Sequence, residues 1–221
     1  PAATWIGVVE GFIFTQAADG DPVARVIFDP KAAKEGYVKP HTVTSIKDRA
    51  RGWGYHGAEK PQKGTGQIAE TGSMTTVGIA CVAIGLNELE NLANKGDKDA
   101  ARFLKDKYKE KETLIMDGMA WLAKNWTVTE NPNYKTWHFY YVYGLERAAI
   151  LYGTETLGDK VWYRDGANAI LKVQNEDGSW GKDTDWFNTC WDTCFSILFL
   201  RRATRPLVAT ESEGVRLLLD E

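Results

Sequence analysis

The stretch "QNEDGSWG", residues 174–181, follows an apolar, helix-like segment and places an Asp-Gly turn two residues before a tryptophan. A glycine just after a helix end readily takes the left-handed conformation that stops the helix. A similar stretch, "QAADGD", begins at Gln16. The two stretches predict that one kind of turn recurs between pairs of helices.

The segments on either side of 174–181 predict the helices that this turn joins. Residues 162–174 carry apolar side chains at helical spacing. Residues 189–203, "TCWDTCFSILFLRRA", are apolar on nearly all sides until the arginines. Because a helix that is apolar all round is a buried one, this pair predicts an amphipathic outer helix followed by a sheltered inner helix.

Two earlier parts of the chain repeat this order. Residues 115–126 contain another Asp-Gly dipeptide, and an apolar segment at 137–153 follows them. The first copy has an apolar segment before Gln16 and a long one at 72–92. The three inner helices align with Gly78, Gly144 and Ser196 in register, which suits close helix approach. A charged, exposed helix is expected at 98–110.

The first copy is interrupted by an insertion. Gly20 and Trp53 correspond to residues that "DGSWG" holds close together, so the turn is split. The residues between them are rich in Pro, Lys and Gly, and we expect an irregular surface excursion near residues 21–71.

The bulk composition excludes several classes of protein. The chain has 221 residues, 43% of them apolar, and a formal net charge of −3. No basic cluster interleaved with aromatic residues is present, so no nucleic-acid partner is expected. The longer apolar runs stop short of the roughly 20 residues that span a bilayer, so no membrane span is expected. Three cysteines do not make a disulfide framework for a chain of this size.

At the turn residues the chain resembles the terpenoid cyclase and protein prenyltransferase superfamily. The likeness is to the Q-x-x-D-G-x-W repeat, or QW motif, of squalene–hopene cyclases. It is also similar to cyclase-like repeat regions of large bacterial proteins, notably those of planctomycetes. One copy of the motif is whole and the other is split, and the positions are Gln174, Asp177, Gly178 and Trp180, and Gln16, Asp19, Gly20 and Trp53.

The resemblance implies an all-α fold, an α/α toroid or part of one, with about three helical hairpins. We expect this domain to cover residues 1–205 and a tail or linker to occupy 206–221. It also implies that the motif has a structural role, in which the glutamine caps a helix end and the tryptophan packs over the neighbouring turn. An open arc of hairpins would expose apolar flanks, so other domains of a longer chain or another subunit are expected partners.

The cyclases of this superfamily begin their reaction with a D-x-D-D motif. The nearest stretch here is "DTDW", with Asp183 and Asp185, and its last acidic position is a tryptophan. Asp192 is a further acidic candidate in the next helix. The competing interpretation is a polar turn that caps the following helix.

The prenyltransferases of the superfamily hold zinc with Asp, Cys and His, and the matching set here is Asp192, Cys194 and His138. On a regular helix, residues two apart point about 200° away from each other, so Asp192 and Cys194 converge only at a helix start. The alternative is that Cys194 is a small buried hydrophobe and Asp192 is hydrogen-bonded. No cofactor is the main expectation, and zinc is the alternative.

Aromatic residues gather near the predicted starts of the inner helices. If these starts meet at one rim, their side chains would line a surface suited to an isoprenoid, a sugar or a peptide. The predicted rim residues are Trp53, Tyr55, Trp137, His138, Tyr140, Tyr141, Trp186 and Trp191.

Three functions compete on these residues. The first is a non-catalytic binding or scaffolding module of a larger protein, which we expect to be extracytoplasmic, in a bacterial periplasm or cell envelope. The second is an isoprenoid cyclase or prenyltransferase-like enzyme, which requires an acidic motif or a metal. The third is a carbohydrate-active toroid, in which aromatic residues and scattered acids serve sugars.

Overall fold

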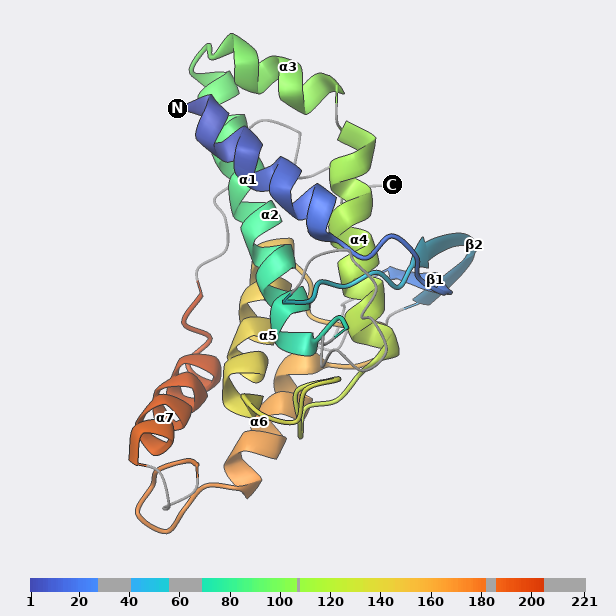
Figure 1. Ribbon diagram of the computed structural model, residues 1–221. Helices are drawn as coiled ribbons and strands as arrows, with labels where there is room; N and C mark the ends of the chain where they lie inside the picture. Colours follow the sequence, from blue (N-terminus) through green and yellow to red (C-terminus); the bar gives the residue numbers. More distant parts are fainter. Residues whose placement is uncertain (28–40, 56–68, 107, 182–185, 205–221) are drawn as a thin grey trace, which may run out of the picture.

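The computed structural model describes residues 1–27, 41–55, 69–106, 108–181 and 186–204. The tail expected at 206–221 lies outside these ranges. Within them the chain is mainly helical, with one small sheet (Figure 1). The elements are α1 (Ala2–Thr15), β1 (Pro22–Ile27), β2 (His41–Arg49), α2 (Gly72–Asn94), α3 (Lys98–Asp106), α4 (Tyr108–Lys124), α5 (His138–Tyr152), α6 (Trp162–Lys172) and α7 (Trp186–Leu200).

The helices α2, α5 and α7 form a row through the molecule, in which α2 contacts α5 and α5 contacts α7. Two outer helices lie alongside this row: α1 packs on α2, and α6 packs on both α5 and α7. The helix α4 departs from the expected hairpin pairing, because it packs on α2, the inner helix of the preceding pair. The first and third helix pairs therefore pack as neighbours, whereas α4 does not form a tight hairpin with α5.

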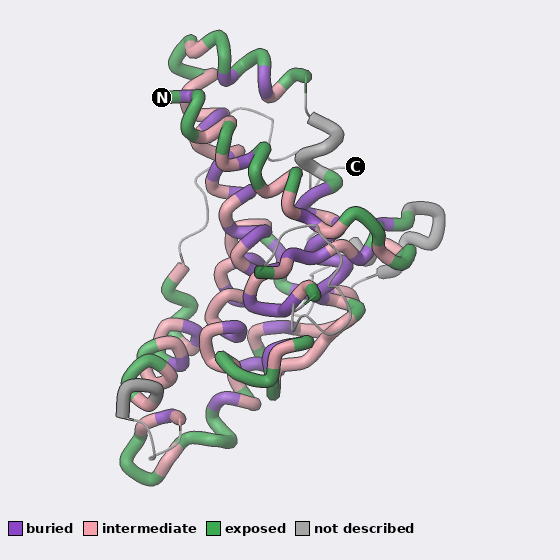
Figure 2. The backbone as a smooth tube through the Cα atoms, viewed as in Figure 1, coloured by how far each residue is buried: buried purple, intermediate pink, exposed green. Residues whose placement is uncertain are grey.

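The core lies where α2 and α5 meet. Ile79, Val82, Val142 and Leu145 are fully buried there, and the tube in Figure 2 is mostly buried along these two helices. Two close approaches depend on glycine. A methyl group at Gly78 would lie 2.4 Å from the Trp53 ring, and one at Gly144 would lie 2.3 Å from Thr76 Oγ1. The small residues that the sequence places in register thus mark points of direct packing.

Local sequence signals explain where the two core helices begin and end. Thr71 precedes α2, and its hydroxyl accepts a hydrogen bond from the backbone N–H of Met74 at 3.2 Å, which is an N-cap. The helix α5 ends at Gly153, whose φ of 83° is the left-handed conformation that glycine adopts readily. The start of α2 and the end of α5 therefore follow from residue type.

The expected irregular insertion contains a regular element. β1 and β2 form an antiparallel pair with Pro22 opposite Arg49, and the register shifts between Ala24 and Arg25. Arg25 and Asp48 make a bidentate ion pair across the two strands, and the pair of strands packs on α4. The expectation of a wholly irregular excursion is wrong at these residues, whereas the all-α class agrees with the mainly helical fold.

Two further expectations are corrected. The charged helix predicted at 98–110 ends at Asp106, and α4 begins already at Tyr108, so the second outer helix is longer than predicted. The helix α7 is not sheltered on all sides, because Cys190, Cys194 and Ile197 are exposed. The apolar sequence of α7 therefore did not predict its burial correctly, because several of its described side chains are exposed.

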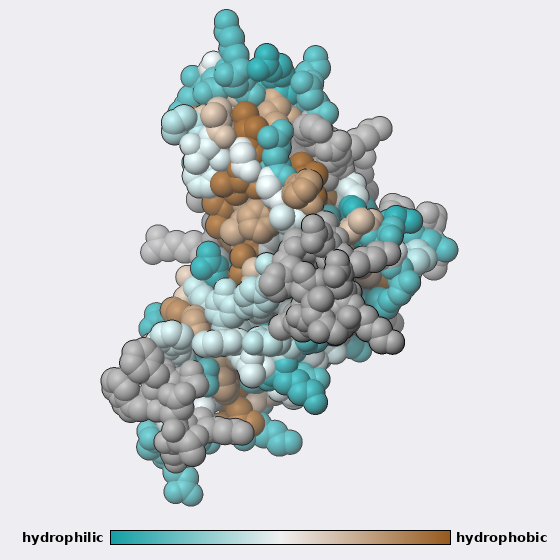
Figure 3. Space-filling model, viewed as in Figure 1, coloured by the Kyte–Doolittle hydropathy of each residue, from teal (hydrophilic) through white to brown (hydrophobic). Residues whose placement is uncertain are grey.

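One described helix, α2, has the length and apolar composition of a membrane span. However, 61% of its most apolar 18-residue window is buried inside the protein. A core helix passes the same test of length and composition, and the contacts of α2 with α1, α4 and α5 are those of a core helix. Figure 3 shows that the apolar surface on this side of the molecule is a narrow strip flanked by polar residues.

Candidate functional site

The two Gln–Trp units, Gln16 with Trp53 and Gln174 with Trp180, make the same hydrogen bonds. In each unit the glutamine side-chain amide donates to the carbonyl two residues before the tryptophan, which belongs to Arg51 in one unit and to Gly178 in the other, at 3.0 and 2.9 Å. The indole N–H donates to the carbonyl four residues before the glutamine, at 2.9 and 2.8 Å.

Two further bonds repeat at the same offsets. The residue after each glutamine donates its N–H to the carbonyl before the tryptophan, at 3.0 Å from Ala17 and 2.9 Å from Asn175. The backbone N–H of the tryptophan donates to a threonine hydroxyl, which belongs to Thr75 in the unit of Gln16 and to Thr193 in the unit of Gln174. These threonines lie three residues before Gly78 and Ser196, which agrees with the predicted register.

The units differ in burial and in their acidic residue. Gln16 is 3% exposed and also donates to the Leu114 carbonyl, whereas Gln174 is exposed. Asp177 accepts from the N–H and hydroxyl of Ser179, and this holds the turn. In the split unit, Gly20 instead packs against the Ala50 backbone, three residues before Trp53.

An exposed aromatic surface joins α5 to α7. Trp137 and Trp191 stack with ring centroids 6.0 Å apart and planes 27° apart, and they are 41% and 44% exposed. Phe195 of α7 contacts both Tyr140 and Tyr143 of α5, at 5.4 and 5.5 Å. We call these five residues the aromatic face.

The aromatic face has a cationic border. Arg147 lies one turn beyond Tyr143 on α5, with its guanidinium 5.7 Å from the centre of the Tyr143 ring. No carboxylate among the described residues forms an ion pair with Arg147, and its charge lies near enough to Cys81 on α2 to favour the Cys81 thiolate. Burial outweighs this effect and raises the pKa of Cys81.

Several predicted rim residues do not belong to this surface. Trp53 is 2% exposed and packs in the core, and Tyr141 is fully buried with its hydroxyl donating to the Thr127 carbonyl. Neither side chain lies on the exposed surface of the described residues. Tyr55 is exposed and packs edge-on against Tyr134, and it lies near enough to Tyr140 of the aromatic face to contribute, after burial, to the raised pKa of Tyr140. The side chain of Trp186 lies outside the described residues.

The predicted zinc ligands have separate environments. His138 is half-buried, its Nε2 lies 2.8 Å from the Val128 carbonyl, and burial lowers its pKa. Asp192 and Cys194 lie more than a turn inside α7, where their side chains diverge, and Cys194 is exposed rather than buried. Within the part of the chain that the structure describes, no three His, Cys, Asp or Glu side chains gather for a metal ion.

The three predicted catalytic acids are not seen together at one site. Asp183 and Asp185 lie outside the described residues. Asp192 is half-buried beside the turn at residues 174–181, where a methyl group on Gly181 would lie 2.9 Å from the Asp192 Oδ2 atom. Burial raises the pKa of Asp192 to about 6, because no described positive charge offsets the desolvation of its carboxylate.

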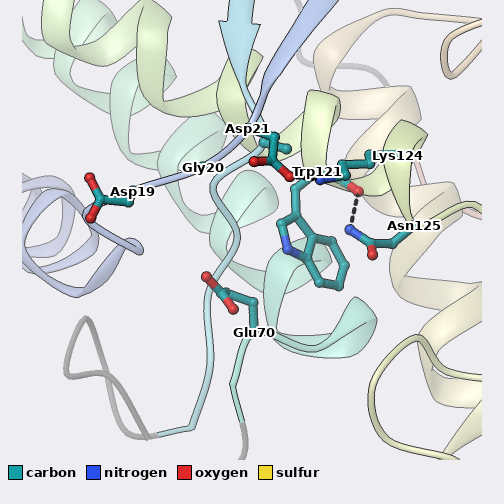
Figure 4. A pocket seen from close by; sticks show the side chains of 8 residues that line it. Asp19, Gly20, Asp21, Glu70, Trp121, Lys124 and Asn125 are labelled. Carbon is teal, nitrogen blue, oxygen red and sulfur yellow. Dashed lines mark hydrogen bonds and ion pairs between the residues drawn. The ribbon is translucent and has the colours of Figure 1, made fainter.

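The sequence did not predict a cavity beside the split turn. Its volume is about 390 Å³, and Figure 4 shows the side chains that surround it. The lining residues come from four separate segments and are Asp19, Gly20, Asp21, Ala50, Glu70, Trp121, Lys124 and Asn125. No sequence spacing reveals such a site, because only the tertiary fold brings these segments together.

Comparison of the chain with protein-family models, curated proteins and solved structures finds no match. The likeness to the cyclase and prenyltransferase superfamily therefore stays a prediction that rests on the residues of the Gln–Trp units.

Proposed function

We propose that this chain is a non-catalytic binding or scaffolding module, and that the aromatic face is its ligand surface. The observation that carries the proposal is the stacked and exposed pair Trp137 and Trp191. Indole rings supply large contact areas at low cost in side-chain entropy, and tryptophan is enriched among the residues that dominate binding energies. A flat or apolar ligand group would gain most at such a surface.

The positions of the two tryptophans favour a preformed site. Trp137 directly precedes α5 with a φ of 61°, and Trp191 lies in the second turn of α7. A left-handed residue other than glycine is uncommon, and such strain is concentrated at functional sites. Because both rings are attached to packed helices, little order would be lost when a ligand binds.

We propose further that the helix pairs are a segment of an α/α toroid. The support is the row of α2, α5 and α7, the outer helices that alternate with it, and the four repeated hydrogen bonds of the Gln–Trp units. In this arrangement the aromatic face would lie on the concave side. An experimental structure whose inner helices do not curve around a common axis would contradict the proposal.

The alternative of an isoprenoid cyclase has weaker support among the described residues. Protonation of an alkene requires a strong acid, whereas burial raises the pKa of Asp192 to about 6. Asp192 is thus better suited to hold a proton than to donate one to a weak base. The prenyltransferase alternative requires a metal centre that the described positions of His138, Asp192 and Cys194 do not form.

Ligand titrations followed by tryptophan fluorescence test the binding proposal. The probes are farnesol, cellohexaose and a proline-rich peptide, which represent an isoprenoid, a sugar and a peptide. We expect saturable binding of one probe, weakened about tenfold or more by Trp191→Ala and by Trp137→Ala. Phe14→Ala is the control, because Phe14 is 82% exposed on α1 and outside the aromatic face.

The folded state of each variant is checked by thermal unfolding. Retained unfolding cooperativity with lost binding supports a ligand surface. Unchanged binding of every probe in both tryptophan variants, or binding of none to the native chain, would contradict it. If both variants unfold, the conservative change Trp191→Tyr separates packing from ligand contact.

A further inference from the structure

The cavity beside the split turn is lined by a hydrogen-bond donor, the indole N–H of Trp121, that no described residue accepts from. Trp121 of α4 is 4% exposed, and it lines the cavity. Its indole N–H has no hydrogen-bond partner among the described residues. Figure 4 shows the nitrogen edge of this ring turned toward the side on which Glu70 and Asp19 lie. The indole nitrogen is not one of the fully enclosed polar atoms that lack a partner, so it opens to the cavity, where water or a ligand can accept its hydrogen bond.

The other polar groups of the cavity offer both acceptors and donors. Asp19, Asp21 and Glu70 present carboxylates, and Lys124 presents an ammonium group that pairs with Asp21. This ion pair lowers the pKa of Asp21 and keeps its carboxylate charged. Asn125 contributes an amide whose nitrogen already donates to the Trp121 carbonyl at 2.9 Å, which leaves its oxygen to the cavity.

This set of groups excludes several ligand classes. Lys124, the one cation among the described lining residues, already pairs with Asp21, so the described wall does not favour an anion. A metal ion does not fit, because within the described ranges these acids do not converge as a ligand group. A simple cation would satisfy the carboxylates but would leave the indole N–H without an acceptor. A polyhydroxylated ligand meets every requirement, because each hydroxyl both donates and accepts.

The split turn explains why the cavity exists. In the intact turn, Asp177 is consumed by its bonds to Ser179, and Gly178 directly precedes that serine. In the split turn, the insertion separates Asp19 from Trp53, and Asp19 lies in the cavity wall. The insertion thereby replaces a compact turn with an opening of about 390 Å³, within the usual range for small-molecule sites.

We propose that this cavity binds a neutral saccharide of one or two rings, with Trp121 donating to a sugar oxygen and Glu70 accepting from a sugar hydroxyl. The site shares no residue with the aromatic face, so the two proposals stand or fall separately. Lys124 and Asp21 would position further hydroxyls through their charges.

Nuclear magnetic resonance of the full chain labelled with ¹⁵N-tryptophan tests the proposal directly. The chain has nine indole N–H groups, and the signal of Trp121 is assigned from its loss in Trp121→Phe or, should that variant not fold, by backbone-linked assignment. The probes are cellobiose, maltose and chitobiose, with putrescine and acetate as charged comparators. We expect at least one disaccharide to shift the Trp121 indole signal saturably.

Two variants connect the shift to the cavity. Glu70→Ala removes one acceptor from a partly exposed position and should weaken disaccharide binding about tenfold. Asp177→Asn changes the acid of the intact turn and should leave the binding unchanged. The signals of Trp137 and Trp191 report separately on the aromatic face.

Two results would overturn the proposal. The first is a Trp121 signal that none of the three disaccharides moves. The second is tighter binding of putrescine than of every disaccharide, which would reassign the cavity to amines. An equal loss of binding in Glu70→Ala and Asp177→Asn would also count against it, because it would indicate a general structural effect.

Discussion

The Asp192 side chain makes the stability of the folded protein depend on pH. Its half-buried carboxylate lies over Gly181, and no described cation lies close enough to lower its pKa. Burial therefore raises the pKa to about 6, above the ordinary value of 3.8. The folded chain binds the proton more tightly than the unfolded chain, so the free energy of unfolding decreases as the pH rises from about 4 to about 6.

Asp192→Asn should remove this cost. At pH 8 we expect the variant to be more stable by about 1 kcal/mol, a value well below the full shift because the side chain is partly open to solvent. At pH 4 the two proteins should differ little, since Asp192 is protonated there in the folded chain. Urea unfolding at both pH values measures the difference. Asp159→Asn, in an exposed pair with Lys160, is the control for the loss of a surface carboxylate.

At the same scale, the Gln–Trp units were readable from the sequence, and the cavity was not. Gln174, Gly178 and Trp180 are close in the chain, so their turn is a local property of residue type. The partners of Gln16 include the Leu114 carbonyl, which lies 98 residues away. Trp121 and Glu70 likewise meet only through the tertiary fold, and their types alone do not distinguish a cavity wall from an ordinary core and an ordinary surface.

At the scale of elements, the close packing of helices depends on glycine at defined levels. Gly78 on α2 lies against the Trp53 ring, and Gly166 on α6 lies against the Phe199 ring, where a methyl group would be 2.5 Å away. In contrast, a methyl group on Gly7 of α1 would have no other atom within 4 Å. Glycine therefore permits close packing at Gly78 and Gly166, whereas at Gly7 no close contact requires it and it only lowers helix propensity.

Gly78→Ala should destabilise the protein by about 1–3 kcal/mol, because the new methyl group forces Trp53 or the helix to shift. Gly7→Ala should instead stabilise it by about 0.5–1 kcal/mol through helix propensity. Chemical denaturation of both variants tests the pair of expectations. Equal effects of the same sign would show that the register of Gly78 has no packing role.

The elements themselves were predicted unevenly. The core helices α2 and α5 were located to within two residues by their apolar periodicity, and Thr71 and Gly153 mark their limits. The strands β1 and β2 were missed, although His41–Arg49 alternates β-branched and polar residues in part. The Pro, Lys and Gly content around them obscured this signal, and the pairing of β1 with β2 is not a local property of either strand.

At the scale of the whole molecule, the last pair of helices presents apolar side chains to solvent. Leu171, Val173 and Ile197 are 54%, 51% and 45% exposed. In the proposed toroid segment, another helix pair would cover this end. An uncovered apolar surface of this kind favours association with other protein surfaces.

We therefore expect the chain to self-associate as its concentration rises, and the double variant Leu171→Lys with Ile197→Lys to reduce that association. Sedimentation velocity over a range of concentrations measures it. Phe14→Lys, at the first helix, is the matched control for removal of an exposed apolar residue. A native chain that stays monomeric throughout would contradict the expectation, as would equal effects of the double variant and the control.

The two Gln–Trp units are closed by the same bonds but enclose very different lengths of chain. The segment from Gln16 to Trp53 is about six times as long as that from Gln174 to Trp180. By loop-closure entropy alone, the longer segment costs about 1.6 kcal/mol more to close. The Trp180 turn should consequently form early in folding, whereas the Trp53 contact should be made late and, through its position between α1 and α2, complete the cooperative folding of the first helix pair.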